Sequence, residues 1–380
     1  MTTERRGPFS FERPFYWSLQ KLEILEKYAT AAARILGKYH RVTFVDLMAG
    51  EAQYSSGDLG STGHFAAIAA GNAALGRQVR CIAYEANDHA FAMLEANTAQ
   101  VRALVEVRHA RWETEVSGLL SDLRGDFALF FVDPMGLRDI PWSALEAIVR
   151  RDASELLVNF ASPTAARLVG KWRTGTPTAA GDKARLNAVY GGDSWIVAAG
   201  QSTVSGGELH ERLARHYAER LASIGSYSVA RQTIRQAGAR GRPKYHIMFA
   251  SRAPLAFEIM NGVLAGQTER LRLEALAATS RVPEGQLSLN LDTESVEEAA
   301  RRLLVERLAS SLVHDESLRG RPMTVEQLFR SAFSSRFGEY RRALYREALS
   351  LLDRQGRLLV QDRRMTGQML QWAAVIELPL

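Results

Sequence analysis

The order of short apolar runs along the chain constrains the fold more than any other feature. Five runs of strand length alternate with segments of helical periodicity, and they cover residues 42–47, 79–84, 104–108, 127–132 and 155–160. Short strands that alternate with helices are typical of an open parallel sheet with helices on both faces. We therefore expect an α/β fold with a doubly wound sheet, preceded by a helix over 16–37.

Two further runs, over 227–235 and 244–250, are separated only by residues 236–243. A connection this short joins antiparallel neighbours, because a parallel pair needs a crossover of a dozen or more residues. Five parallel strands closed by such a hairpin are characteristic of the class I methyltransferase sheet, and much less so of a dehydrogenase sheet. We expect a Rossmann-like sheet whose last strand is antiparallel.

The rest of the chain divides by composition. We expect an N-terminal arm and helix over 1–41, a methyltransferase-like domain over 42–265, a polar linker over 266–295 and a small domain over 296–380. In the small domain, three helical patterns precede a glycine and a short hairpin, an order that indicates a winged helix. Basic residues on or near its exposed third helix suit DNA phosphates, although winged helices also dock proteins. These residues are Arg336, Arg341, Arg342 and Arg346.

The charge and the cysteine content limit the class of protein. The net charge is +6 and comes mostly from arginine, which favours either an anionic partner or simply a solvated surface. The single cysteine, Cys81, excludes a disulfide framework and a multi-cysteine metal site, so we expect no metal. No apolar run approaches the length of a membrane span, and the N-terminus lacks a signal-peptide pattern. We expect a cytoplasmic protein.

Residues at the ends of the first three strands form a candidate cofactor site. Glu85 ends the second strand, where one carboxylate can accept both ribose hydroxyls of a nucleoside cofactor. Asp46 and Gly50 follow the first strand, and the glycine allows close approach of the backbone. Trp112, just past the third strand, could stack on an adenine. The alternatives are a turn cap for Asp46, a favourable helix-terminus charge for Glu85 and a core position for Trp112. Acids at both strand ends, on a methyltransferase-like sheet, favour S-adenosylmethionine.

Asp133 ends the fourth strand and is the candidate catalytic residue. In the corresponding loop, amino-group methyltransferases have an acid or amide, two prolines and an aromatic residue. Here Met135 and Gly136 replace the second proline and the aromatic residue, which counts against base methylation, while Asp133 could still orient a substrate or act as a base. The tip of the closing hairpin carries basic residues that either contact substrate at the pocket mouth or are ordinary solvated charges. They are Arg235, Arg240, Arg242 and Lys244.

Several segments together resemble the three-Cys-motif partner proteins. These segments are KLEILEKY (21–28), FVDLMAG (44–50), GSTG (60–63), VDPMG (132–136) and KYHIMFASRAPLAFEIM (244–260). The resemblance implies a class I S-adenosylmethionine methyltransferase-like fold and a radical S-adenosylmethionine partner that carries the three cysteines. This sequence departs from the usual pattern at the cofactor turn and the catalytic loop, which implies a weakened or altered activity. The departures are at Met48, Glu51, Ala52, Thr62 and Met135.

The predicted linker contains the hexapeptide QLSLNL, which resembles the peptide with which bacterial proteins dock on the replicative sliding clamp. In such a peptide the glutamine bonds the pocket rim and the leucines fill the pocket, and an extended segment suits this recognition. Alternating leucines could equally form an edge strand. The residues concerned are Gln286, Leu287, Leu289 and Leu291.

Two main hypotheses follow. The first is an S-adenosylmethionine-binding, methyltransferase-like protein that works with a radical partner on nucleic acid, in DNA modification or repair. The second is an adaptor without catalysis that recruits a repair complex to DNA or to the sliding clamp, and it is favoured by the departures at Met48, Ala52 and Met135. Methylation of a small molecule or a protein is a third option. The pattern specifies neither the methyl acceptor nor the oligomeric state.

Overall fold

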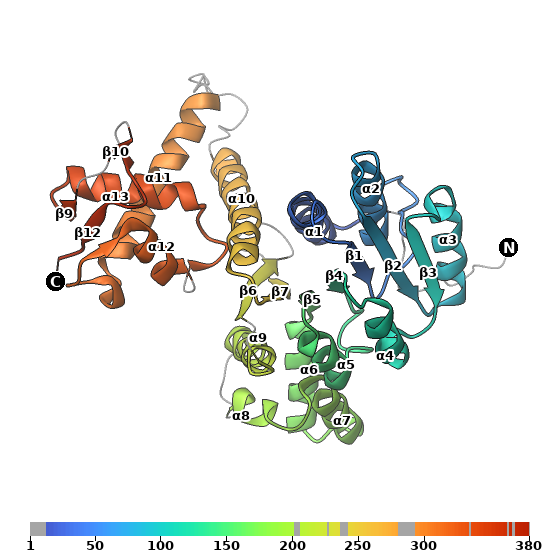
Figure 1. Cartoon of the computed structure of the whole chain (residues 1–380). Coiled ribbons are helices and arrows are strands. Elements are labelled where there is room, and N and C mark those ends of the chain that lie inside the picture. Colours follow the sequence, from blue (N-terminus) through green and yellow to red (C-terminus); the bar gives the residue numbers. More distant parts are fainter. Residues whose placement is uncertain are drawn as a thin grey trace, which may run out of the picture. The chain divides into compact units, whose positions relative to one another are not determined.

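The structure is a computed structural model that describes residues 13–200, 206–225, 228–235, 242–279, 293–333, 336–362, 365–366 and 369–379 of the chain. The chain forms two compact units, with the boundary between Ile259 and Met260 (Figure 1). Within the described residues, no helix combines the length and the apolar character that a membrane crossing requires.

A seven-stranded sheet is the centre of the first unit, and its strand order is β3-β2-β1-β4-β5-β7-β6. The first five strands are parallel, whereas β7 is antiparallel to both β5 and β6. The predicted class I methyltransferase-like sheet, with its antiparallel last strand, is therefore confirmed. The strands are β1 (Val42–Asp46), β2 (Val79–Glu85), β3 (Val105–His109), β4 (Phe127–Val132), β5 (Ser154–Phe160), β6 (Ser228–Arg235) and β7 (Pro243–Ser251).

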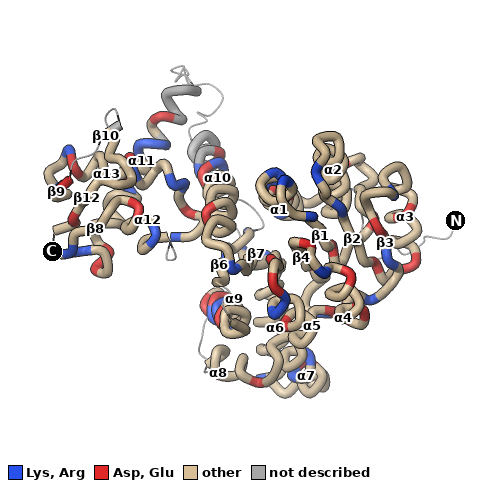
Figure 2. The backbone as a smooth tube through the Cα atoms, viewed as in Figure 1, with Lys and Arg blue, Asp and Glu red and all other residues tan. Residues whose placement is uncertain are grey.

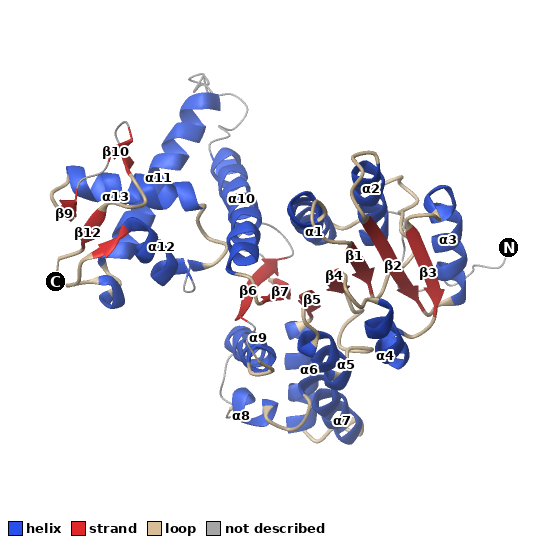
Figure 3. Ribbon diagram, viewed as in Figure 1, coloured by secondary structure: helices blue, strands red, loops and turns tan. Residues whose placement is uncertain are grey.

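Helices cover both faces of this sheet, as Figure 3 shows. They are α1 (Tyr16–Leu36), α2 (Ser61–Ala73), α3 (Asp88–Thr98), α4 (Trp112–Asp122), α5 (Trp142–Arg150), α6 (Ser162–Arg173), α7 (Ala179–Tyr190), α8 (Trp195–Ala199) and α9 (Gly206–Ala222), with a short 3-10 helix η1 (Ala99–Val101). Strands β1 and β5 are buried along their whole length, because side chains that alternate between the two faces meet helices on each. Continuous apolar runs in the sequence were therefore the correct signal.

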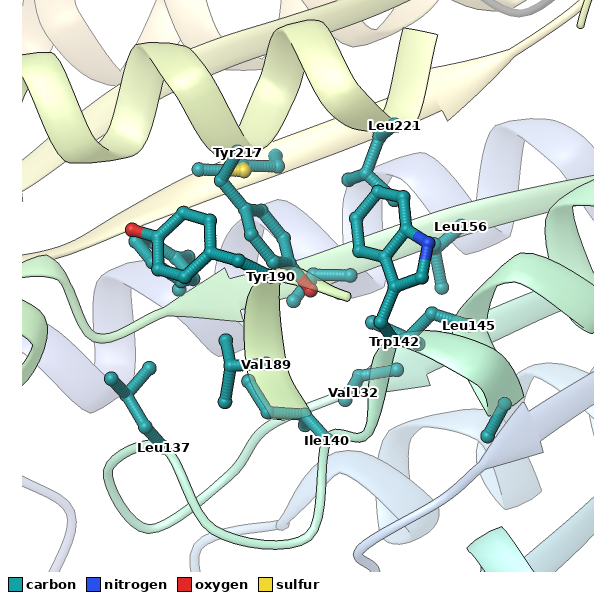
Figure 4. Close-up of a cluster of buried hydrophobic side chains, with 14 of the residues drawn as sticks. Val132, Leu137, Ile140, Trp142, Leu145, Leu156, Val189, Tyr190, Tyr217 and Leu221 are labelled. Atoms are coloured by element: carbon teal, nitrogen blue, oxygen red, sulfur yellow. The ribbon is translucent and has the colours of Figure 1, made fainter. Parts of the chain in front are cut away.

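An aromatic cluster fills the core between the sheet and helices α5 to α9 (Figure 4). The ring of Tyr217 stacks on Phe160 with centroids 4.4 Å apart and meets Trp142 edge-on at 5.8 Å. Helix α7 ends at Gly191, whose φ is +67°, and a Cβ there would lie 2.4 Å from the Trp142 ring. Only glycine fits this position, which lets the helix end directly against the cluster.

A buried ion-pair network lies at the amino edge of the sheet. Asp126, just before β4, is fully buried and accepts hydrogen bonds from Arg41, from Arg80 and from the Thr43 hydroxyl. The Thr43 hydroxyl also accepts a hydrogen bond from Arg80 Nε at 3.1 Å. One carboxylate therefore joins the beginnings of β1, β2 and β4.

Helix α1 is attached to the sheet through a buried acid. The Tyr28 hydroxyl donates to Glu155 Oε2 at 2.5 Å, and the Ser251 hydroxyl donates to Glu155 Oε1 at 3.0 Å. The Tyr28 ring also packs edge-on against Phe249, with centroids 4.8 Å apart. Burial of the Glu155 carboxyl raises its pKa to about 7, a rise that these two hydrogen bonds oppose.

We expect the contribution of Glu155 to stability to fall as the pH rises, because burial penalises the ionised carboxylate. The folded-state pKa of Glu155 lies above its ordinary value of 4.5, so its contribution to stability is complete below pH 4.5 and is lost as the pH passes about 7. In chemical denaturation, the free energy of unfolding of wild type should fall relative to Glu155→Gln by on the order of 3 kcal/mol between these limits. A difference between the two proteins that does not change with pH would contradict this assignment.

The second unit begins within a long helix, α10 (Pro254–Thr279). Its further elements are α11 (Thr293–Val313), η2 (Glu316–Leu318), α12 (Val325–Phe333), α13 (Arg342–Arg354) and the strands β8 (Met323–Thr324), β9 (Leu359–Asp362), β10 (Met365–Thr366), β11 (Met369–Leu370) and β12 (Val375–Glu377). Strands β8, β12 and β9 form an antiparallel sheet in that order. Helices α11 to α13 and this sheet share one apolar core.

The predicted linker over 266–295 is wrong at its N-terminal side. Helix α10 continues to Thr279, because the residues after Gly266 are mostly strong helix formers and Gln267 lies buried. The polar composition of this stretch misled the prediction, since a helix needs only one apolar face. The hexapeptide residues Gln286, Leu287, Leu289 and Leu291 lie outside the described residues.

Candidate functional site

Asp46 ends β1 and stabilises the turn that follows it. Its carboxylate is fully buried and accepts a hydrogen bond from the Thr62 hydroxyl at 2.7 Å and a long one from the Met48 backbone N–H at 3.4 Å. Burial raises its pKa to about 6, and the nearby Asp133 carboxylate adds to the rise. Asp46 therefore holds the start of α2 in place. This arrangement agrees with the alternative in which Asp46 caps the turn. The carboxylate of Asp46 is buried, so it offers no exposed oxygen for the predicted direct contact with a cofactor.

Glu85 ends β2 and joins two turns at the carboxyl edge of the sheet. Its Oε2 accepts from the Gly50 N–H at 2.9 Å, and its Oε1 accepts from the Asn87 N–H at 2.7 Å. The Asn87 side chain caps α3 by accepting from the Ala90 N–H at 3.0 Å. Since the helix already has this cap, Glu85 is not required for that purpose. Each of its oxygens keeps a second lone pair that can accept a ligand hydroxyl.

The turn between β1 and α2 is tightly folded around Ala52. The φ of Ala52 is +62°, a value that residues with a Cβ rarely adopt. Its carbonyl accepts from the Gly60 N–H at 2.7 Å, and a Cβ on Gly63 would lie 2.5 Å from the same oxygen. The segment between them closes as a small hairpin, in which the Tyr54 N–H donates to the Asp58 carbonyl at 2.8 Å. This cofactor turn is an ordered loop with little spare space.

Asp133 is bonded from two sides. Its Oδ1 accepts from Asn159 Nδ2 at 2.8 Å, and its Oδ2 forms an ion pair with the Lys21 ammonium of α1. Tyr54 also lies close: burial raises the pKa of its hydroxyl, and the Lys21 ammonium opposes that rise. The sequence analysis missed Lys21 and Asn159. Two features of the sequence could have indicated these residues. One is a lysine on the apolar face of α1, and the other is an amide within the otherwise apolar end of β5.

Trp112 does not fit its predicted role. Its side chain is part of the main core, only 2% of the residue is exposed, and its Nε1–H donates to the Asp139 carbonyl at 3.1 Å. A ring enclosed in this way has no free face for an adenine. Trp112 is a core residue, which was the alternative reading.

The end of β6 and the start of β7 lie at the carboxyl edge of the sheet, because β6 runs parallel to β5. The Lys244 ammonium lies 4.7 Å from the centroid of the Trp17 ring, and the Tyr245 hydroxyl donates to the Trp17 carbonyl at 2.5 Å. Arg242 is exposed, Arg235 is partly buried, and Arg240 lies outside the described residues. Their role as substrate contacts stays a prediction, and the contacts of Lys244 add Trp17 to this edge.

A buried serine, a buried histidine and a partly exposed glutamate form a chain beside this hairpin. Ser162 Oγ lies 2.8 Å from His246 Nδ1, and His246 Nε2 lies 2.9 Å from Glu211 Oε1. The hydrogen bond from His246 lowers the pKa of Glu211. The contact with Arg231 lowers this pKa further, by a smaller amount. The spacing matches that of a nucleophilic triad, but Ser162 and His246 are fully buried. No substrate can reach the hydroxyl, so this chain connects α6, α9 and β7 structurally.

The arginines predicted to face DNA are bound within the second unit. Arg342 pairs with Glu326 and lies over the Trp372 ring, and Arg346 donates to the Leu370 carbonyl at 2.7 Å. Arg341 pairs with Glu269 at 3.0 Å. Arg336 is buried and pairs with Asp315 at 2.9 Å, so its predicted exposure is wrong. Figure 2 shows acidic residues interspersed with the basic ones, as along α9 and α12.

A comparison with models of protein families gave no match, and a comparison with curated proteins gave none either. Among solved structures, the chain is similar to a protein from Legionella pneumophila, with 11% identity, a TM-score of 0.38 and coverage of 70% of this chain and 92% of that chain. It is similar to a SAM-dependent methyltransferase from Agrobacterium tumefaciens, with 12% identity, a TM-score of 0.33 and coverage of 62% of each chain. It is also similar to the O-methyltransferase TomG from Streptomyces achromogenes, solved in complex with SAM, with 17% identity, a TM-score of 0.32 and coverage of 59% of this chain and 78% of that chain. Because these TM-scores are low, the assignment depends on the order and direction of the strands. These give the first unit a class I methyltransferase-like fold.

Proposed function

We propose that the first unit binds S-adenosylmethionine and is a methyltransferase-like enzyme. The observation that carries this proposal is Glu85, whose carboxylate lies between the Gly50 and Asn87 N–H groups at the carboxyl edge of the sheet. Ligands of open α/β sheets bind outside the carboxyl ends of the strands. A carboxylate held rigidly at this edge, with lone pairs to spare, fits the two hydroxyls of a ribose.

The side chains of the first unit would position the cofactor and the methyl acceptor and would supply the negative charge of the site. Bound S-adenosylmethionine would supply an electrophilic methyl group on a sulfonium. Glu85 would hold the ribose, the turn stabilised by Asp46 would shape the site, and Asp133 would face the acceptor. Asp133 and Asp46 lie close enough for their charges to interact, so the cofactor turn and the acceptor side are adjacent.

Titration calorimetry of the full chain with S-adenosylmethionine and S-adenosylhomocysteine tests this proposal. We expect saturable binding of both, and no binding of NAD, since the strand order differs from that of a dehydrogenase sheet. The absence of binding to either sulfur nucleoside would refute the enzyme proposal.

The wider biological context is part of the same proposal. The resemblance to three-Cys-motif partner proteins supports a radical S-adenosylmethionine protein as the partner, and the basic winged-helix pattern and the clamp-like peptide support nucleic acid as the site of action. In the second unit, three helices with a small antiparallel sheet support a winged helix. DNA phosphates would there compete with Glu326 for Arg342 and with Glu269 for Arg341. Retention on duplex DNA at low salt, lost at high salt, is the expected result.

An adaptor without catalysis is the second candidate. It is favoured by the compact turn at Ala52 and by an Asp133 whose two oxygens are both bonded. This candidate proposes the sliding clamp as a partner, through Gln286 and Leu289. Combined Gln286→Ala and Leu289→Ala substitutions should then abolish co-precipitation of the clamp without changing cofactor binding. Unchanged co-precipitation would count against clamp docking.

A further inference from the structure

Asn159 has an acceptor that the protein does not use. The carboxylate of Asp133 only accepts hydrogen bonds, so the Asn159 amide must turn its Nδ2 toward Asp133 and its Oδ1 away. That Oδ1 is buried and has no hydrogen-bond partner among the residues that the structure describes, and only 2% of Asn159 is exposed. A buried carbonyl oxygen without a donor is costly, and such groups deserve a specific explanation.

Asp133 and Asn159 together form a pair of neighbouring acceptors. Lys21, which comes from α1, places its ammonium on Asp133, and its side chain is only 11% exposed. The group that Asp133 already accepts is therefore a nitrogen with several N–H bonds. A ligand nitrogen with two N–H bonds could donate one to Asp133 and one to the free oxygen of Asn159.

Aromatic and cationic side chains lie at the N-terminal end of α1, one helical turn before Lys21, and at the start of β7. Trp17 lies one helical turn before Lys21 on α1, stacks on Phe15 with centroids 4.6 Å apart, and carries the Lys244 ammonium over its ring. Phe15 is 61% exposed, and Met135, two residues after Asp133, is 59% exposed. Stacked rings beside a cation suit a planar base and its phosphate. The aromatic residue that the loop after β4 lacks is thus present on α1.

We propose that the methyl acceptor is the exocyclic amino group of a nucleobase, which donates to Asp133 Oδ2 in the place that the Lys21 ammonium takes in the free protein and to Asn159 Oδ1. This inference rests on the proposed methyltransferase function. The lone pair of the amino nitrogen forms the bond to the methyl carbon, while the bond from that carbon to sulfur breaks and sulfur keeps its electron pair. The nitrogen then releases one proton, which the Asp133 carboxylate accepts.

The test is a binding measurement with paired oligonucleotides in the presence of S-adenosylhomocysteine. One pair of short single strands carries adenine or purine, and the other carries cytosine or 2-pyrimidinone, so that each pair differs only in the amino group. Ribose and deoxyribose versions separate RNA from DNA. Wild type should prefer the amino-bearing base in one pair by about tenfold, the equivalent of about 1.4 kcal/mol.

Substitutions assign this preference to the pocket. Asp133→Asn and Asn159→Leu should abolish it, and Lys21→Met should tighten binding several-fold, because no ammonium then competes with the base. Lys27→Met, at an exposed position of α1 paired with Glu23, is the matched control and should leave binding unchanged. Circular dichroism and the affinity for S-adenosylhomocysteine should stay unchanged in all four variants, which shows that they fold.

Three results would overturn the inference. Equal binding within both pairs, with S-adenosylhomocysteine still bound, would refute the nucleobase acceptor and leave the proposed function intact. Mass spectrometry that finds a methyl group on Lys21 after incubation with S-adenosylmethionine would identify this lysine as the acceptor instead. Failure of wild type to bind S-adenosylhomocysteine would refute the proposed function and this inference together.

Discussion

Replacing Glu85 by glutamine should weaken the binding of S-adenosylhomocysteine by about tenfold to a hundredfold, since hydrogen bonds to a charged group contribute about 1.5–3 kcal/mol. The amide has one acceptor oxygen instead of two. Its NH2 group would face the N–H of Gly50 or of Asn87, to both of which the carboxylate now bonds. The substitution therefore removes an acceptor for the ribose and also loosens the two turns. Calorimetry on the full chain measures the change.

The matched control for Glu85 is Asp88→Asn. Asp88 begins α3 three residues later, its side chain is almost fully exposed, and its carboxylate lies 3.1 Å from His109 Nε2. The Asp88→Asn substitution changes the charge near the carboxyl edge of the sheet without altering the turns at Gly50 and Asn87. An equal loss of affinity in both variants would mean that net charge, and not the placement of Glu85, governs binding.

Replacing Asp126 by alanine should lower the free energy of unfolding by about 3 kcal/mol, at the lower end of the range for breaking a buried ion pair. The side chain of Asp126 is completely buried, whereas those of Arg41 and Arg80 are 47% and 32% exposed. Water can therefore solvate both guanidinium groups after the substitution, which limits the loss. The Thr43 hydroxyl, by contrast, loses its acceptor inside the sheet.

Chemical denaturation followed by tryptophan fluorescence measures this effect in the unit concerned. Five of the six tryptophans belong to the first unit, at positions 17, 112, 142, 172 and 195, and the sixth is Trp372. The control is Asp122→Ala, which removes an exposed partner of Arg108 and should cost less than about 1 kcal/mol. Similar losses for the two variants would contradict the role assigned to the Asp126 network.

The sequence predicted the sheet and its helices well. The strand over 127–132 has the predicted bounds, the helix predicted over 16–37 is α1 (Tyr16–Leu36), and the antiparallel hairpin follows from the short connection between its strands. These features depend on local periodicity and on connection length, which can be read along the chain. The predicted linker begins inside α10, because a polar helix surface resembles a linker when only composition is considered.

The site was less predictable, because its contacts join residues that are far apart in the sequence. Glu85 could be placed at a strand end, but its bonds to Gly50 and Asn87 require the folded turns. The burial of Trp112 depends on the loop that contains Asp139. The pairing of Lys21 with Asp133 joins positions 112 residues apart, and no local pattern specifies the partner.

The contacts of α1 also determine when this helix can dock during synthesis. Tyr28 bonds Glu155, which is 127 residues later, and the Trp17 carbonyl bonds Tyr245, which is 228 residues later. A ribosome that has made only the first half of the sheet presents α1 without these partners. Helix α1 therefore leaves the ribosome well before it can reach its final packing. The part of its surface that meets β5 and β7 stays open to other partners, such as chaperones, until β7 is complete.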